Sequence, residues 1–205
     1  PFNELAYAAA QAIIKKPVAY NPLYFYGNTG LGKTHLMQAV GNYIKQHNKE
    51  KRVYYVTSER FTVDYINSVQ SNKVHNFKEK YRKYDVSIID DIQFLSNKEK
   101  TQEELFHLFN HMYDGNKQII FSSDQHPNYL QNLEDRLKSR FSAGMVVDIS
   151  PLETESKVAI LQTKAKQNNF NLPEETAFYI ASAVHGSIRE LEGVLNSVIC
   201  QTQLK

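Results

Sequence analysis

Five short, mostly apolar runs are spaced along the first part of the chain, with longer patterns of mixed apolar and polar residues between them. The runs are rich in β-branched and aromatic residues and apolar on both faces, which is typical of strands buried on both sides of a parallel sheet. Because helical patterns separate the runs, we predict an α/β fold in which a five-stranded parallel sheet is sandwiched by helices. The runs cover residues 23–27, 52–57, 85–90, 118–123 and 145–149.

The segment between the second and third runs is longer than a simple crossover requires. It covers residues 58–84, whereas a crossover between parallel strands needs about a dozen residues. Apolar side chains recur every four residues from Phe61 to Val69, and a second stripe runs from Val74 to Tyr81. This spacing predicts a pair of helices inserted between the two strands.

After residue 149 the strand pattern stops and three helical patterns follow. Pro173 precedes the second pattern, whose first turn is acidic. Ser187 and Glu190 form the S-x-x-E capping box that begins the third. We therefore predict two domains, a sheet-containing base at 1–150 and a small all-helical module at 151–205.

Composition restricts the class of protein more than the function. The chain has 205 residues, of which 41% are apolar, and a net charge of +2, so any nucleic-acid surface must come from local clustering of basic residues. No apolar run approaches the ~18 residues of a membrane-spanning helix, and no signal peptide begins the chain. We therefore expect a cytoplasmic protein. Its one cysteine, Cys200, excludes an internal disulfide, and we expect it to pack within a helix.

A phosphate loop of the form G-x-x-x-x-G-K-T follows the first predicted strand. Its glycines let the backbone wrap phosphate groups, Lys33 reaches the β and γ oxygens, and Thr34 supplies a hydroxyl to Mg²⁺. The strand before it and the helix predicted from Lys33 argue against a chance match. The residues expected here to bind ATP or ADP are Asn28, Thr29, Gly30, Leu31, Gly32, Lys33, Thr34 and His35.

Acidic residues follow the third and fourth runs. Asp90 ends the third run and Asp91 follows it, at the edge of the sheet where we expect the phosphate loop to begin. We assign Asp90 to Mg²⁺, together with Thr34, and Asp91 to the catalytic polarisation of a water. A pair of surface-turn aspartates is the alternative, but the mostly apolar stretch Val86–Ile89 precedes them directly. Asp124 would face the attacking water from the neighbouring strand, and a turn or helix cap is its alternative.

Three arginines could contact the phosphate groups of the nucleotide. Arg136 and Arg140 lie one helical turn apart on one face, from which an arginine can reach the γ-phosphate of a neighbouring subunit. The alternative is a solvated basic face. Arg189 lies in the first turn of the helix that Ser187 caps, and because a helix N-terminus attracts anions, Arg189 could clamp phosphate there.

Several segments together resemble the DnaA family of bacterial replication initiators. The most specific are "GLGKTHL", "IDDIQF" and "EDRLKSRF", and the resemblance extends from Asn3 to Lys205. It implies an AAA+ P-loop NTPase, with residues 1–150 as its base and 151–205 as its lid. It also implies that the phosphate loop is a Walker A motif and that the paired aspartates form a Walker B motif.

The resemblance assigns further roles. It places Asp124 at the sensor 1 position, Arg140 at the arginine finger with Arg136 close by, and Arg189 at the sensor 2 position of the lid. Arg82 matches a basic residue of the family's subunit contacts. On this basis we expect Asp124 and Arg140 to act in catalysis, and Arg82, Arg136 and Arg140 to lie between subunits.

In this family the inserted helix pair faces the channel of a helical filament and holds single-stranded DNA. The matching positions here are Ile66, Lys98 and Lys100. The physical pattern agrees, because residues 72–84 contain five Lys or Arg and one Glu, and basic charge follows a phosphate backbone without reading its sequence. The alternative is that the aromatic residues of this segment are core and its lysines are only solvated. Lys100 stands where arginine is common, so it lacks the planar fork.

These observations predict the ATP-dependent module of a replication initiator. It would bind ATP with Mg²⁺, assemble with copies of itself into a helical oligomer and engage single-stranded origin DNA, with slow hydrolysis as the off-switch. A replicative helicase or regulators could dock on it. The helix-turn-helix domain with which the family reads duplex origin boxes is not expected within these residues.

Two other functions compete with this prediction. One is an initiator-related regulator or helicase loader that acts through protein contacts, which would not need a basic helix pair in the insertion. The other is a small-molecule kinase, but no arginine-rich substrate lid is found and the C-terminal helices would have no role.

Overall fold

The structure is a computed structural model that describes residues 3–203. The chain divides into two compact units. The larger unit contains Glu4–Gly27 and Lys33–Ile149, and the smaller contains Asn28–Gly32 with the residues from Ser150 onward. The centre of the phosphate loop is thus grouped with the C-terminal helices, which the sequence pattern did not predict.

A five-stranded sheet forms the centre of the larger unit, in the order β2-β3-β4-β1-β5. Every neighbouring pair is parallel, so the predicted fold class is confirmed. Tyr26 lies opposite Ser123 on one side and Asp148 on the other, and Thr57 lies opposite Asp90. The loops after these strands therefore leave the sheet at one edge. The strands are β1 (Leu23–Tyr26), β2 (Val53–Thr57), β3 (Val86–Asp90), β4 (Gln118–Ser123) and β5 (Met145–Asp148).

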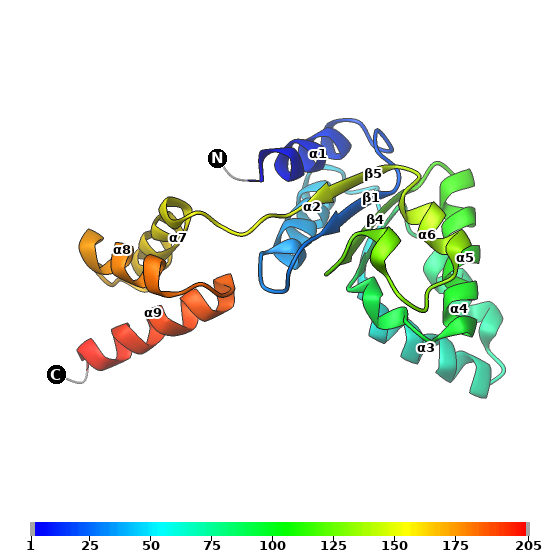
Figure 1. The fold of residues 1–205 in the computed structure, drawn as a ribbon. Coiled ribbons are helices and arrows are strands. Elements are labelled where there is room, and N and C mark those ends of the chain that lie inside the picture. Colours follow the sequence, from blue (N-terminus) through cyan, green and yellow to red (C-terminus); the bar gives the residue numbers. More distant parts are fainter. Residues whose placement is uncertain (1–2, 204–205) are drawn as a thin grey trace. The chain divides into compact units, whose positions relative to one another are not determined.

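Helices cover both faces of this sheet (Figure 1). On one face lie α1 (Glu4–Lys15) and α2 (Lys33–His47), and on the other α5 (Glu99–Asp114) and α6 (Asp135–Phe141). The short helices η1 (Ile92–Leu95) and η2 (Pro127–Tyr129) follow β3 and β4. Between the sheet and α6, the buried rings of Phe121 and Phe141 meet at 4.7 Å.

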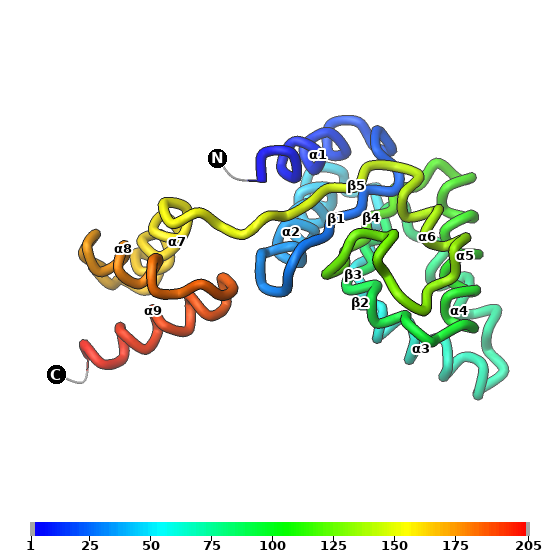
Figure 2. The backbone as a smooth tube through the Cα atoms, in the orientation of Figure 1, coloured from blue at the N-terminus to red at the C-terminus, as the bar shows by residue number. Residues whose placement is uncertain are grey.

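The predicted inserted pair is present as α3 (Ser58–Gln70) and α4 (Val74–Arg82). Figure 2 follows the chain through both helices beside α5. The buried rings of Phe61, Phe77 and Tyr81 pack together, with centroids 4.6–5.3 Å apart. The aromatic residues of this segment are therefore core, as the alternative interpretation proposed.

The smaller unit contains the three predicted C-terminal helices, α7 (Thr154–Gln167), α8 (Glu174–Ala183) and α9 (Ile188–Gln203). Their core includes Leu161, Ala177 and Leu191. The backbone N–H of Glu190 donates to Ser187 Oγ at 3.2 Å, so the predicted cap is present.

The expectation that Cys200 is packed was wrong. The buried face of α9 repeats every four residues at Leu191, Leu195 and Ile199, and Cys200 lies one step beyond that face and is exposed. Within residues 3–203, no helix has both the length and the apolar character needed to cross a membrane.

Candidate functional site

The phosphate loop connects β1 to α2 and relies on glycine at three positions. Gly27, Gly30 and Gly32 have φ angles of 149°, 83° and 96°, a region that residues with a Cβ atom rarely adopt. A Cβ atom on Gly27 would also overlap the carbonyl oxygen of Ile149. The glycines are therefore required by the conformation of the loop and by its close packing.

Lys33 and Thr34 are the first two residues of α2, and their side chains contact different partners. The Lys33 side chain is buried, and its Nζ donates to the carbonyl oxygen of Gly27 at 2.5 Å. Thr34 Oγ1 donates to Oδ2 of Asp90 at 2.7 Å. The structure thus brings the loop hydroxyl to the acid that the sequence assigned to Mg²⁺.

Asp90 is 1% exposed and is surrounded by hydroxyl groups. Its Oδ2 also accepts a hydrogen bond from Tyr55 Oη at 2.6 Å, and its Oδ1 accepts one from Ser122 Oγ. A buried carboxylate is stable only when it is paired or hydrogen-bonded, and these donors meet that condition. Burial, followed by the hydrogen bond to Asp90 and its charge, raises the pKa of Tyr55 above 10.0, so the phenol keeps its proton and donates.

The oxygen donors at this edge fit Mg²⁺. The residues from 3 to 203 contain no group of three or more His, Cys, Asp or Glu side chains that could hold a metal ion. Mg²⁺ in nucleotide sites does not need such a cage, because water and phosphate oxygens complete its shell around one or two protein oxygens. Thr34 and Asp90 supply hard oxygens of that kind.

Asp91 follows Asp90 in a left-handed conformation, with φ of 56°. Its N–H donates to Ser122 Oγ at 2.9 Å, and its Oδ1 accepts from Gln93 at 3.3 Å. Burial, followed by the charge of Asp90, raises the pKa of Asp91 above 3.8, and Asp124 adds to this shift. All three predicted aspartates therefore lie at one edge of the sheet.

In the smaller unit, the N-terminus of α9 touches the phosphate loop. The N–H of Ile188 donates to the carbonyl oxygen of Gly30 at 3.0 Å, and a Cβ atom on Gly30 would overlap the Ser187 side chain. Arg189 is the next residue and is exposed. It thus begins close to the loop backbone that it is expected to serve.

The other predicted residues of the phosphate loop differ in exposure. Asn28 and Thr29 are exposed, and Leu31 is half-buried. His35 is exposed in the first turn of α2.

The two arginines of α6 share an aromatic support but differ in charge pairing. The guanidinium carbons of Arg136 and Arg140 lie 4.7 and 5.6 Å from the ring centre of Phe106. Arg136 is also paired with Glu134. Arg140 is exposed and has no ion pair within the part of the chain that the structure describes. It therefore presents an uncompensated charge at the surface.

Arg82 does not lie on α6 with Arg136 and Arg140. It ends α4, and its carbonyl oxygen accepts from Lys117 Nζ at 2.5 Å. No contact joins it to Arg136 or Arg140 among the described residues. The structure thus places the three predicted intersubunit residues at two separate positions.

The three candidate DNA contacts meet at one hollow of about 560 Å³ between α3 and the start of α5. Ile66 and Val69 contribute apolar side chains that are 46% and 47% exposed, and Lys98 and Lys100 contribute positive charge. The hollow is lined by Thr62, Tyr65, Ile66, Val69, Gln70, Asn97, Lys98, Glu99, Lys100 and Thr101. Sequence reasoning named Ile66, Lys98 and Lys100 but not Val69, the second exposed apolar residue of the hollow.

The basic charge of α4 is less available than its sequence indicates. Lys80 Nζ lies 2.6 Å from Asp64, and Lys78 Nζ lies 3.4 Å from Glu104. Two of the five basic residues in segment 72–84 are therefore neutralised by acids of neighbouring helices.

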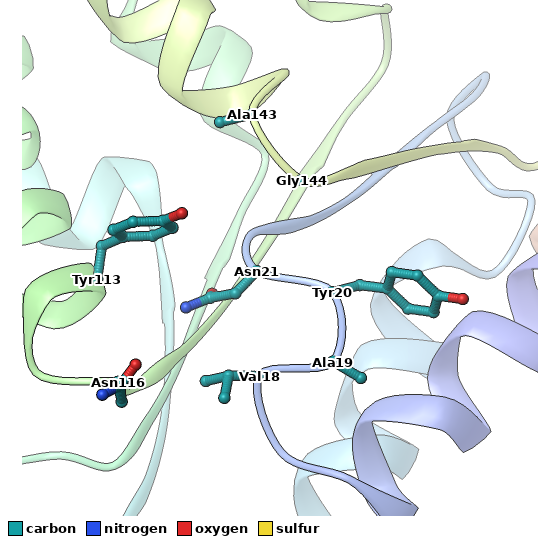
Figure 3. Close-up of a pocket in the computed structure, with 8 residues that line it drawn as sticks. All are labelled: Val18, Ala19, Tyr20, Asn21, Tyr113, Asn116, Ala143 and Gly144. Atoms are coloured by element: carbon teal, nitrogen blue, oxygen red, sulfur yellow. The ribbon is translucent and has the colours of Figure 1, made fainter.

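A separate cavity of about 440 Å³ lies at the opposite edge of the sheet (Figure 3). It is bounded by the loops that enter β1, β4 and β5, so it lies away from the phosphate loop. Figure 3 shows the Asn21 side chain directed toward Tyr113 and Asn116, while Tyr20 turns away from them. Asn21 is itself hydrogen-bonded to the backbone of Lys117 and Ile119, which ties this loop to β4.

Three side chains of the site were missed by sequence reasoning. Tyr55 and Ser122 hold Asp90, and Phe106 supports the two arginines. Tyr55 and Phe106 lie inside elements whose apolar patterns account for them without these contacts, so the contacts depend on tertiary placement. Ser122 had the clearest signal, because a serine near the end of a buried strand needs a hydrogen-bond partner.

The family model described as the bacterial DnaA ATPase domain matches residues 1–148. Domain III of the Thermotoga maritima replication initiation protein DnaA is 41% identical, with a TM-score of 0.95 over 100% of this chain and 85% of that chain. The AMPPCP-bound DnaA of Aquifex aeolicus is 36% identical, with a TM-score of 0.89 over 97% of this chain and 62% of that chain.

Two further solved structures are similar to this chain. A replication initiator DnaA bound to AMPPCP and single-stranded DNA is 37% identical, with a TM-score of 0.89 over 96% of this chain and 61% of that chain. The chain thus spans less than two thirds of the two AMPPCP-bound proteins. The DnaC helicase loader is only 18% identical, with a TM-score of 0.63 over 71% of this chain and 89% of that chain, and shares the fold alone.

Proposed function

The chain belongs to the family of bacterial DnaA ATPase domains, and from this premise we propose that it is the ATP-dependent module of a replication initiator. It binds ATP with Mg²⁺, assembles with copies of itself when ATP is bound, and engages single-stranded DNA at the origin. Residues 1–150 serve as the AAA+ base and 151–205 as the lid. The module acts in the cytoplasm, where a bacterial chromosome lies.

The observation that carries this proposal is the contrast between Asp90 and Arg140. Thr34, Tyr55 and Ser122 hold Asp90 in a site suited to nucleotide and Mg²⁺. Arg140 carries an uncompensated charge, and among residues 3–203 it lies over the rings of Phe106 and Phe109 and does not contact that site. A positive charge of this kind suits the γ-phosphate of a nucleotide bound by another copy.

Each nucleotide-site residue then has a task. The backbone from Asn28 to Gly32 wraps the phosphates, and Lys33 reaches the β and γ oxygens. His35 and Arg189 are assigned as further nucleotide-binding residues, Arg189 because it lies at a helix N-terminus. Thr34 and Asp90 would hold Mg²⁺, which when bound offsets the charge of the phosphates.

Hydrolysis is assigned to the neighbouring acids. Asp91 polarises the attacking water, because it is a carboxylate directly beside the acid of the cation site and can accept a proton there. Asp124 orients that water from the next strand. Slow hydrolysis is acceptable in this scheme, since ADP lacks the phosphate that Arg140 touches, and hydrolysis therefore ends assembly.

Single-stranded DNA is assigned to the hollow beside α3. Ile66 offers apolar contact, and Lys98 and Lys100 offer charge to the phosphate backbone. A related initiator, 37% identical, has been solved with AMPPCP and single-stranded DNA, and this supports the assignment.

A regulator or helicase loader that acts mainly through protein contacts is the second candidate. The likeness to the DnaC loader is at the level of the fold, whereas the initiators are 36–41% identical. We therefore favour the initiator, to which a replicative helicase or regulators can still dock.

The first prediction tests the arginine assignment by sedimentation with ATP and with ADP. The parent chain should form oligomers with ATP only, and Arg140→Ala should remain monomeric with ATP while still binding it. Lys138→Ala is the matched control, because it removes a positive charge from the same helix on the opposite face. Normal ATP-dependent assembly of Arg140→Ala would refute the assignment.

A further inference from the structure

Tyr55 lies next to the acid of the candidate Mg²⁺ site. Its hydroxyl donates to Asp90 Oδ2 at 2.6 Å, and the same oxygen accepts from Thr34 Oγ1 at 2.7 Å. The contact spans neighbouring strands, since Tyr55 pairs with Ile88, two residues before Asp90.

The direction of the Tyr55 side chain follows from the strand. Successive side chains of β2 point to opposite faces, so Tyr55 and Thr57 share a face and Tyr54 takes the other. Tyr54 packs against Tyr81 of α4 and Tyr84, at ring distances of 5.4 and 4.5 Å. Tyr54 therefore packs against aromatic rings on one face of the sheet, whereas Tyr55 reaches the carboxylate of Asp90 on the other.

Thr34 and Tyr55 are not equivalent partners of Asp90. The Thr34 hydroxyl must turn a lone pair toward a bound cation, so its position depends on that cation. The Tyr55 hydroxyl does not face this demand, so its hydrogen bond to Oδ2 need not break when a cation binds. The terminal torsion of an aspartate has a broad energy minimum. A hydrogen-bond donor such as Tyr55 therefore determines whether the carboxylate is oriented toward the cation position before Mg²⁺ binds.

We propose that Tyr55 is a positioning residue of the cation site, which fixes Asp90 through its hydroxyl and thereby strengthens Mg²⁺ binding without touching the nucleotide. The proposal rests on the nucleotide and Mg²⁺ function proposed above. Partners that orient metal-site residues typically change metal affinity by about 10- to 100-fold when they are removed.

The test is the affinity of Tyr55→Phe for a fluorescent ATP analogue, measured in excess EDTA and then across a Mg²⁺ titration. The phenyl ring keeps the packing of the parent. We expect the affinity in EDTA to be unchanged and the Mg²⁺ concentration at half effect to rise about tenfold. Tyr54→Phe removes a hydroxyl one residue away on the opposite face and should leave both values unchanged.

The outcomes separate this inference from the proposed function. An unchanged Mg²⁺ midpoint for Tyr55→Phe overturns the inference, and so does an equal loss of affinity with and without Mg²⁺, which indicates a purely structural role. If the parent chain shows no gain from Mg²⁺ at all, the proposed cation site itself fails. Direct titration with Mn²⁺, followed by electron paramagnetic resonance, should show the same tenfold weakening for Tyr55→Phe.

Discussion

Asp90 and Asp91 are neighbours in the sequence but have different surroundings. Asp90 is buried among the hydroxyls of Thr34, Tyr55 and Ser122. Asp91 accepts a longer bond from Gln93, at 3.3 Å, and burial raises its pKa, with the charge of Asp90 adding to the effect. Two carboxylates with such different environments suit two tasks, one holding a cation and the other accepting a proton.

This difference gives a prediction for Asp91→Asn. The amide keeps the size of the side chain but cannot accept a proton, so ATP hydrolysis should fall by about 10²-fold or more. ATP binding and ATP-dependent sedimentation should be retained. Single-turnover hydrolysis measures the first and sedimentation the second, with Asp114→Asn at the end of α5 as the control. Hydrolysis at the parent rate would remove Asp91 from the mechanism.

At the scale of elements, the periodicity of apolar residues predicted the strands and helices whose packing buries one or both of their faces. Apolar runs located all five strands, and the spacing from Phe61 to Val69 and from Val74 to Tyr81 located α3 and α4. Buried strands and amphipathic helices repeat a pattern along the chain, which makes them readable.

Contacts made once between distant elements leave no such pattern. The phenol of Tyr55 and the ring of Phe106 satisfy the apolar pattern of their own elements equally well without Asp90 or Arg140. The grouping of Asn28–Gly32 with the C-terminal helices includes the backbone hydrogen bond from Ile188 to Gly30 and the close approach of Ser187 to Gly30. These features required the three-dimensional structure.

The inserted helix pair is joined by an acid-sensitive contact at Asp64. This α3 residue accepts from Lys80 Nζ at 2.6 Å and from Tyr81 Oη at 3.0 Å. Burial alone would raise the pKa of Asp64, but these hydrogen bonds and the charges of Lys80 and Arg60 together lower it below 3.8. The stability that it contributes is therefore present above that value and is lost as the pH falls through the lower folded-state pKa.

Asp64→Asn should accordingly destabilise the chain near neutral pH, by up to about 1 kcal/mol. The difference from the parent should disappear at acid pH, where the parent carboxyl is protonated. Urea unfolding at a series of pH values measures this. Asp135→Asn, whose side chain is 101% exposed, should show no such convergence. A deficit for Asp64→Asn that is constant down to low pH would contradict the account.

At the scale of the whole molecule, the described chain leaves two features without an internal partner for their function. Arg140 carries charge but no ion pair within residues 3–203, and the hollow at Ile66 and Lys100 is open to solvent. Both are explained if ATP binding brings copies of the chain together and the assembled copies hold DNA. Nucleotide state and DNA affinity should then change together.

Binding of single-stranded DNA with ATP and with ADP, at matched salt and with sedimentation in parallel, tests this central claim most directly. We predict tight binding and oligomers with ATP, and weak binding without oligomers with ADP. Ile66→Ala and Lys100→Ala should each weaken binding several-fold without changing nucleotide affinity, while Val63→Ala, on the same helix as Ile66 but outside the hollow, should not. Equal DNA binding in ATP and ADP, or parent-like binding by Ile66→Ala and Lys100→Ala, would contradict the account.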